Sequence, residues 1–158
     1  MITLIEVDGS HSSLQAIRYG IAAATGASES GIVLLHVSPS GRTRDLERGR
    51  FLLEDGLKTC QFVAKYITIR TRLEVGDPCE KLPAVAEAEE ADLVVIGSHG
   101  YDCFPHVADL GTHTARLIRQ LGRPVVVVAP DGREVKLALD APAPSSEAAY
   151  DFPVRPDR

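Results

Sequence analysis

The stretch ADLVVIGSHGYDCFPHVADLGTHTARLIRQLGRPVVVVAP, residues 91–130, decides the fold. It holds two apolar runs, residues 92–97 and 124–129, and a segment with helical spacing of apolar residues lies between them. Consecutive parallel strands need a crossover connection of this kind, usually a helix. Because both runs are almost continuously apolar, we expect two parallel strands that are covered on both faces.

The same alternation of strand and helix patterns extends back to the N-terminus. It predicts an α/β fold: a single-domain open sheet, mainly parallel, with helices between its strands. The third apolar run differs from the others, because apolar residues such as Ile69 alternate with charged ones such as Arg70. That run is therefore expected to be a half-exposed edge strand. The five runs are residues 2–7, 32–37, 67–75, 92–97 and 124–129.

The character of the chain changes after residue 130. The turn sequence PDG is followed by REVKLALD, in which apolar and polar residues alternate, and this predicts a hairpin strand that folds back on the fifth run. The rest is rich in proline and typical of a flexible tail. We accordingly expect a domain over residues 1–130, an added edge strand over 131–140 and a flexible tail over 141–158.

Composition and charge exclude several classes of protein. The net charge of −5 argues against broad binding to nucleic acid. No apolar run approaches the length of about 20 residues that a membrane-spanning helix needs, and the N-terminus has the pattern of a strand and not of a signal peptide. Cys60, Cys79 and Cys103 show no paired spacing, which indicates a reducing, cytoplasmic location.

The unusual residues of the chain follow the predicted strands. Residues 8–10 (Asp-Gly-Ser) follow the first run, and residues 97–100 (Gly-Ser-His-Gly) follow the fourth. Gly111, Thr112 and Thr114 stand where the last helix begins, a position at which free backbone N–H groups can bind phosphate. Small residues also occur at such turns without a ligand, so the spacing alone leaves both interpretations open.

Four blocks follow one another in order: IEVDGSHSSLQAIRYGIAAA (5–24), IVLLHVSP (32–39), LEVGDPCEKLPAVAEAEEADLVVIGSHG (73–100) and GTHTARLIRQLGRPVVVVAP (111–130). In that order they resemble the successive blocks of the universal stress protein family, over residues 1–130. The resemblance implies a Rossmann-like, five-stranded parallel sheet in the order 3-2-1-4-5, with helices on both faces.

The resemblance also implies a site for an adenine nucleotide. Nucleotide-binding members of the family carry Gly-x-x-Gly, nine residues, and then Gly with Ser or Thr. This chain has both parts of the pattern, residues 97–100 and Gly111 with Thr112, but the segment between them, residues 101–110, is ten residues long. Asp8 and two backbone segments would hold the adenosine, and the glycine-threonine segment would line the phosphates. The implied site residues are Val7, Asp8, Val37, Ile96, Gly97, Gly100, Gly111, Thr112, His113 and Thr114.

Three functional hypotheses follow. The first is a cytoplasmic universal stress-type protein that binds ATP or another adenine nucleotide, with or without Mg²⁺, and acts as a sensor or regulator. The second is a nucleotide-free dimer that acts through an unknown protein partner; the longer loop, which carries Asp102 and Asp109, favours it, and the intact glycines favour the first. The third is a slow ATPase that depends on Asp8. We expect no efficient enzymatic turnover.

Two further clusters are better explained without a ligand. His99, Cys103, His106 and His113 crowd one region, but their spacing matches no zinc-binding pattern, so no metal site is expected. The basic segment GRTRDLERGR (41–50) interleaves arginine with acidic residues, which is typical of a solvated helix start.

A homodimer is expected through the strand at residues 125–129. An unpaired apolar edge favours association, and the resemblance implies pairing through the same strand. The EVKLALD segment either covers this edge in its own chain or exchanges across the dimer.

Overall fold

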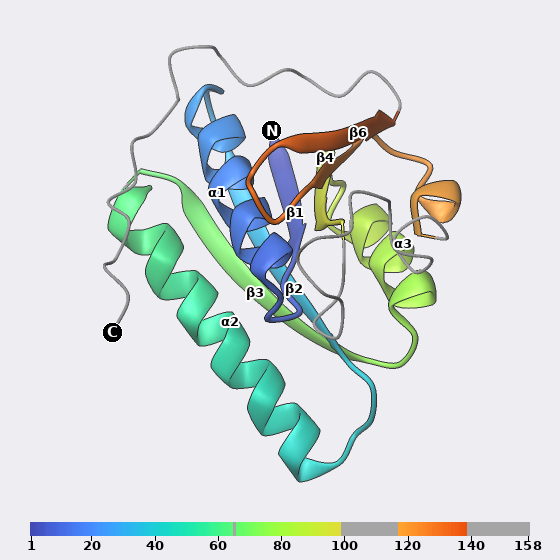
Figure 1. Cartoon of the computed structure of the whole chain (residues 1–158). Helices are drawn as coiled ribbons and strands as arrows, with labels where there is room; N and C mark the ends of the chain where they lie inside the picture. The colour runs from blue at the N-terminus through green and yellow to red at the C-terminus, as the bar shows by residue number, and fades with distance from the viewer. Residues whose placement is uncertain (65, 99–116, 139–158) are drawn as a thin grey trace.

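The computed structural model describes residues 1–64, 66–98 and 117–138. Six strands form one sheet in the order β3-β2-β1-β4-β5-β6 (Figure 1). The first five in sequence run parallel, so the predicted order 3-2-1-4-5 is confirmed. The strands are β1 (Ile2–Glu6), β2 (Gly31–Ser38), β3 (Thr68–Val75), β4 (Leu93–Gly97), β5 (Val125–Val128) and β6 (Glu134–Ala138).

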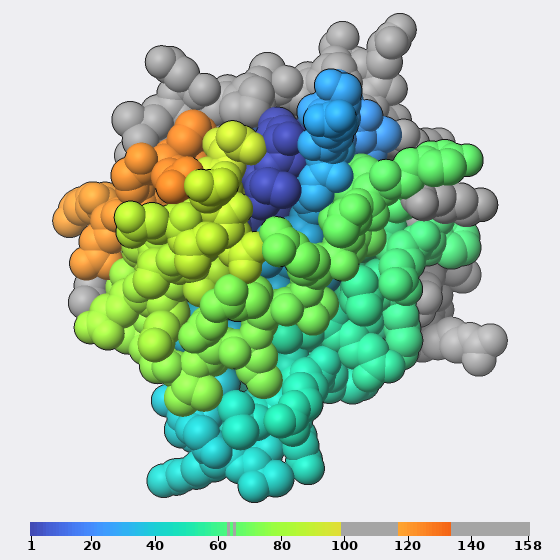
Figure 2. All heavy atoms as spheres, turned by 180° about the vertical axis from the view of Figure 1, so that it is seen from behind, coloured from blue at the N-terminus to red at the C-terminus, as the bar shows by residue number. Residues whose placement is uncertain are grey.

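Helices cover both faces of the sheet. One face packs against α1 and α2, and the other packs against α3 and a short helical segment at residues 117–120. Figure 2 shows the α3 face, with the start of α2 projecting beyond the rest of the chain. In the described part of the chain, no helix is long and apolar enough to cross a membrane. The helices are α1 (His11–Thr25), α2 (Thr43–Val63) and α3 (Pro78–Ala88).

Strand position explains the apolar patterns in the sequence. Every residue of β2 is buried, because β2 lies inside the sheet and is covered on both faces. The outer strand β3 is partly exposed, as its alternation predicted. Its charged residues are paired: Arg70 and Arg72 both contact Glu89, at 2.7 and 2.8 Å. Charges on an edge strand of this kind discourage pairing with another sheet.

Side chains at the starts of α1 and α3 satisfy backbone N–H groups that the helices leave free. Ser10 caps α1, and its Oγ accepts a hydrogen bond from the Ser13 N–H at 3.0 Å. Asp77 caps α3 in the same way, with Pro78 in the first helical turn. Helix α2 begins at Thr43 without a side-chain cap. The four arginines at the start of this helix and just before it, Arg42, Arg44, Arg48 and Arg50, are exposed, which agrees with a solvated helix start.

The hairpin strand expected after residue 130 is present as β6. Gly132 has φ +84°, a value that suits glycine, and the Ala129 N–H donates to the Arg133 carbonyl at 2.8 Å. Strand β6 then pairs antiparallel with β5 in the same chain. Strand β5 is therefore not a free edge, and of the two arrangements predicted for this segment the structure contains the covered one. Residues 141–158, predicted as a flexible tail, lie outside the described residues.

Strand β4 approaches α1 most closely at Gly97. A Cβ atom at this position would lie 2.5 Å from Ser12 Oγ, 3.0 Å from the Ser13 amide nitrogen and 3.1 Å from the Ser12 carbonyl carbon. Two of these three atoms belong to the backbone of the first turn of α1, which cannot turn aside as a flexible side chain would. The end of β4 thus packs directly on the helix, and glycine is required for that contact.

We predict that Gly97→Ala lowers the free energy of unfolding by about 1–3 kcal/mol, the usual range for an overpacked core. Gly41→Ala is the matched control, because a Cβ there meets no heavy atom within 4 Å and should change stability by less than about 0.5 kcal/mol. Urea denaturation measures both variants. Equal unfolding midpoints for the two variants would show that the contact does not constrain the fold.

Candidate functional site

The candidate site lies at the carboxyl ends of β1 and β4. Strand β1 pairs with β2 on one side and with β4 on the other. The chain adds β2 and β3 on one side of β1 and then adds β4 and β5 on the other side, so the strand order reverses between β1 and β4. Crevices at such switch points are the usual ligand sites of open α/β sheets. Val7 and Asp8 directly follow β1, and Gly97 is the last residue of β4. The fold therefore brings these predicted residues to one place.

A tight turn fixes Asp8 at the start of α1. Gly9 has φ +84°, which permits the chain to turn directly from β1 into the helix. The Ser10 N–H donates to Asp8 Oδ1 at 2.8 Å, and this bond orients the carboxylate. The Ser10 side chain is meanwhile occupied by its capping bond. The turn thus holds one carboxylate at the end of the sheet, beside the N-terminus of a helix.

Val7 is held in place from β2. Its N–H donates to the Leu35 carbonyl at 2.7 Å, and its own carbonyl lies 2.6 Å from Nδ1 of His36. Because a carbonyl oxygen only accepts, His36 carries its proton on Nδ1 and donates it to Val7. His36 is itself buried against the backbone position of Gly49. The sequence analysis did not select His36; the signal was a polar residue inside an otherwise apolar run.

Glu6 is a second residue that the sequence analysis missed. It ends β1 and is partly buried. Burial raises the pKa of its carboxyl group to about 8, and the nearby charge of Asp8 adds to the effect. At neutral pH this carboxyl group is therefore mostly protonated. The signal was again a charged residue that interrupts an apolar run.

The remaining described residues form an apolar wall. Ile96 is fully buried and Val37 nearly so, and both belong to the core on the α3 face. The Ser98 N–H donates to the Val128 carbonyl at 2.9 Å, so the pairing of β4 with β5 continues past the end of the strand. The other predicted site residues lie outside the described residues: Gly100, Gly111, Thr112, His113 and Thr114.

No group of three potential metal ligands occurs within residues 1–64, 66–98 and 117–138. The His/Cys cluster that was weighed in the sequence lies at residues 99–113, outside those ranges. The two described cysteines, Cys60 and Cys79, are buried in the core. Burial raises the pKa of Cys60 to about 12, which leaves an unreactive thiol.

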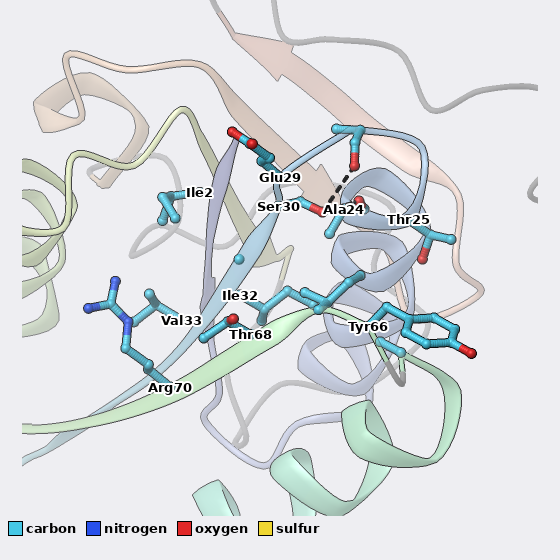
Figure 3. A pocket seen from close by; sticks show the side chains of 14 residues that line it. Ile2, Ala24, Thr25, Glu29, Ser30, Ile32, Val33, Tyr66, Thr68 and Arg70 are labelled. Atoms are coloured by element: carbon cyan, nitrogen blue, oxygen red, sulfur yellow. Dashed lines mark hydrogen bonds between the residues drawn. The ribbon is translucent and has the colours of Figure 1, made fainter.

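A cavity of about 770 Å³ opens at the opposite end of the sheet (Figure 3). It lies where β1, β2 and β3 begin, and its walls include Tyr66 and Arg70. Two of its polar groups already have partners: the Ser30 hydroxyl donates to the Ala24 carbonyl, and Arg70 pairs with Glu89. This end of a parallel sheet is not the one at which ligands usually bind. The cavity is therefore separate from the candidate site.

Comparison with known proteins gives the same fold. A model of the universal stress protein family matches residues 2–129. A universal stress protein of Mycolicibacterium smegmatis (strain ATCC 700084 / mc(2)155) is 34% identical over 134 residues, which cover 79% of this chain. The chain spans 42% of the length of that protein.

Solved structures agree with the family match. A universal stress protein in complex with cAMP is 22% identical with a TM-score of 0.65, and the match covers 82% of this chain and 97% of that one. The universal stress protein from Archaeoglobus fulgidus in complex with dAMP is 17% identical with a TM-score of 0.66, covering 80% and 94%. At these identities the likeness concerns the fold alone. The family model matches residues 2–129, which is most of the chain, and this match shows that the chain belongs to the universal stress protein family.

Proposed function

We propose that this protein binds an adenine nucleotide at the carboxyl ends of β1 and β4. The observation that carries the proposal is the convergence of Asp8, Ile96 and Gly97 at the switch point of the sheet. The two solved relatives are complexes with cAMP and with dAMP, and both ligands are adenine nucleotides with a single phosphate. That agreement supports the same ligand class for this chain.

Each described residue has a defined part in this proposal. Asp8 accepts a hydrogen bond from a hydroxyl of the sugar, because its carboxylate is already oriented by the Ser10 N–H. The backbone of Val37 and the second lone pair of the Val7 carbonyl offer hydrogen bonds to the adenosine, and Ile96 provides an apolar surface for the base. Gly97 lets the end of β4 pack against the first turn of α1, which brings the backbone at this end of the sheet beside the sugar. These binding roles depend on the positions of residues on β1, β2 and β4, and none of them requires a catalytic group.

The phosphate side rests on the sequence. The residues proposed to surround the phosphate are Gly100, Gly111, Thr112, His113 and Thr114. Residues 101–110 lie between Gly100 and Gly111 in the sequence. That intervening segment contains two aspartates and no lysine or arginine. A triphosphate carries more negative charge than a monophosphate and gains less from such a segment. We therefore expect AMP to bind at least as tightly as ATP, with or without Mg²⁺.

The biological part of the proposal is regulatory. A cytoplasmic sensor or regulator of the stress response needs a ligand that favours one conformation and a partner that recognises it. We do not propose efficient catalysis: of the two carboxyl groups described at the site, Asp8 already accepts the Ser10 N–H and Glu6 is mostly protonated at neutral pH. A nucleotide-free protein that acts through a protein partner is the second candidate, and the longer acidic segment at residues 101–110 favours it.

We also propose that the chain forms a homodimer at the β5 side of the sheet. Strand β5 consists of four buried valines, and among the described residues only the hairpin strand β6 pairs with its outer edge. The pairing is irregular between Val127 and Val128. Exchange of β6 between two copies would keep the same hydrogen bonds and link the chains.

Thermal unfolding with and without millimolar Mg-ATP or AMP tests the nucleotide site. A ligand at about 100 times its dissociation constant adds roughly 2.7 kcal/mol to stability, which raises the unfolding midpoint by about 5–10 °C for a domain of this size. Gly111→Val should abolish the shift, whereas Gly41→Val, the matched control at an open position, should retain it. Denatured protein is also assayed for released adenine, so that nucleotide carried through purification is detected. If the unfolding midpoint does not shift and no adenine is released, the proposal is contradicted.

Truncation tests the role of β6. A chain that ends at Pro130 exposes the valine edge of β5 and should form larger species than a chain that ends at Asp140, which keeps β6. Size-exclusion chromatography with light scattering at several concentrations compares the two. If both truncated chains show the same oligomeric state as the full chain, β6 does not control assembly.

A further inference from the structure

Glu6 lies inside the proposed adenosine site. The parallel register pairs Glu6 with Leu35 of β2, and on the other side it pairs Ile5 with Val95 of β4. The same register continued by one residue places Glu6 beside Ile96. Side chains alternate along a strand, so Glu6 faces the same side as Leu4, which is the α3 side.

The side chains around Glu6 on this face are apolar. They belong to the core cluster between the sheet and α3. By position on the strands, the members of this cluster nearest to Glu6 are Leu4, Leu35, Val37 and Ile96. Within the described residues, no hydrogen bond to the Glu6 carboxyl group is present. Glu6 is only partly buried and is absent from the buried polar groups that lack a partner, so its carboxyl group is open to a polar ligand that enters the site.

The charges near Glu6 favour the neutral acid. Asp8 is the charged group that acts on it, and its negative charge opposes ionisation of Glu6. The elements packed against this face contribute buried apolar side chains, from α3 and from residues 117–121. The cations of β3, which β2 separates from β1, are engaged elsewhere: Arg72 contacts Glu74 and Glu89, each at 2.8 Å, and Arg70 contacts Glu89. The other charged residues of the adjoining elements include Glu80, Lys81, Arg119 and Arg123.

We propose that Glu6 is a specificity-determining residue that recognises the hydrogen-bonding edge of the bound base. The inference rests on the proposed function, because it assumes that the base lies between Val37 and Ile96. A neutral carboxylic acid presents one O–H donor and one C=O acceptor side by side. Adenine presents the complementary pair, a ring nitrogen that accepts and an amino group that donates.

Ionisation of Glu6 would remove this complementarity. A carboxylate only accepts, so it would place negative charge against the lone pair of the ring nitrogen. Because the pKa is raised to about 8, the folded protein keeps the neutral acid below that pH and loses it above. Adenine binding should therefore be strong near neutral pH and weaken as the pH rises through about 8.

The test measures the affinity of AMP and of purine riboside 5′-monophosphate, which lacks the amino group, by titration calorimetry at about pH 7 and about pH 9. The phosphate is fully ionised near pH 9 and largely ionised near pH 7, because its second pKa is about 6. At pH 9 about one tenth of Glu6 is neutral, so AMP affinity should fall about tenfold. At pH 7, AMP should bind about tenfold tighter than the analogue, the value of one hydrogen bond in a desolvated site.

Three variants separate this role from a structural one. Glu6→Gln keeps a donor and an acceptor and should bind AMP with no fall between the two pH values. Glu6→Leu should bind both ligands equally. Glu74→Gln is the matched control, a carboxylate at the end of β3, and should keep the wild-type pH profile. If Glu6→Leu does not fold, the comparison of wild type with Glu6→Gln decides the question alone.

Two results would overturn the inference in distinguishable ways. If the wild type binds AMP equally at both pH values, or Glu6→Gln shows the same fall as the wild type, Glu6 does not recognise the base, and the nucleotide site itself stands. If the nucleotide-free wild-type protein binds AMP at neither pH, the proposed function fails and this inference fails with it.

Discussion

The close contact between Gly97 and the first turn of α1 is the constraint on which the carboxyl end of the sheet depends. It places the end of β4 directly against Ser12 and Ser13, with backbone atoms of both residues about 3 Å from where a Cβ would lie. The start of α1 therefore lies next to the switch point of the sheet. The free N–H groups and the positive dipole of a helix start favour an anionic ligand at such a place. A larger residue at position 97 would separate the strand from the helix.

A second set of contacts holds the turn between β1 and α1. Leu35 and His36 of β2 bind the backbone of Val7, and the turn itself binds the carboxylate of Asp8 through Ser10. The groups proposed to hold adenosine are thus oriented before any ligand enters. Pre-oriented groups lose little conformational entropy on binding. The buried acid Glu6 is an exception, because its polar group has no partner within the described residues.

Much of the fold follows from patterns that are local in the sequence. Apolar runs separated by helical segments determine the parallel sheet, and Ser10 and Asp77 mark the helix starts. The alternation in residues 67–75 correctly indicates an edge strand. The alternation in β6 fits both pairing within the chain and exchange between chains, so only the three-dimensional register shows which of the two the structure contains. The alternation of apolar and polar residues along a strand does not indicate which other strand it pairs with.

The site was predictable to a smaller extent. Asp8 and Gly97 stand out because they end apolar runs, and the fold brings them together. Glu6 and His36 escape such reasoning, because each lies within a run whose apolar neighbours suggest only core. Their importance depends on what faces them: Asp8 and an apolar wall for Glu6, and the Val7 carbonyl for His36. These relations arise from strand register and cannot be read from composition or spacing.

The most direct test of the central claim is amide NMR of ¹⁵N-labelled protein titrated with AMP. The site proposed here requires the largest shift changes at Val7–Gly9, at Val37 and at Ile96–Ser98, with little change at Thr25–Ile32 and Ile67–Arg70. The opposite pattern, with changes concentrated around the cavity at the amino ends of the strands, would place the ligand at the wrong end of the sheet and contradict the site.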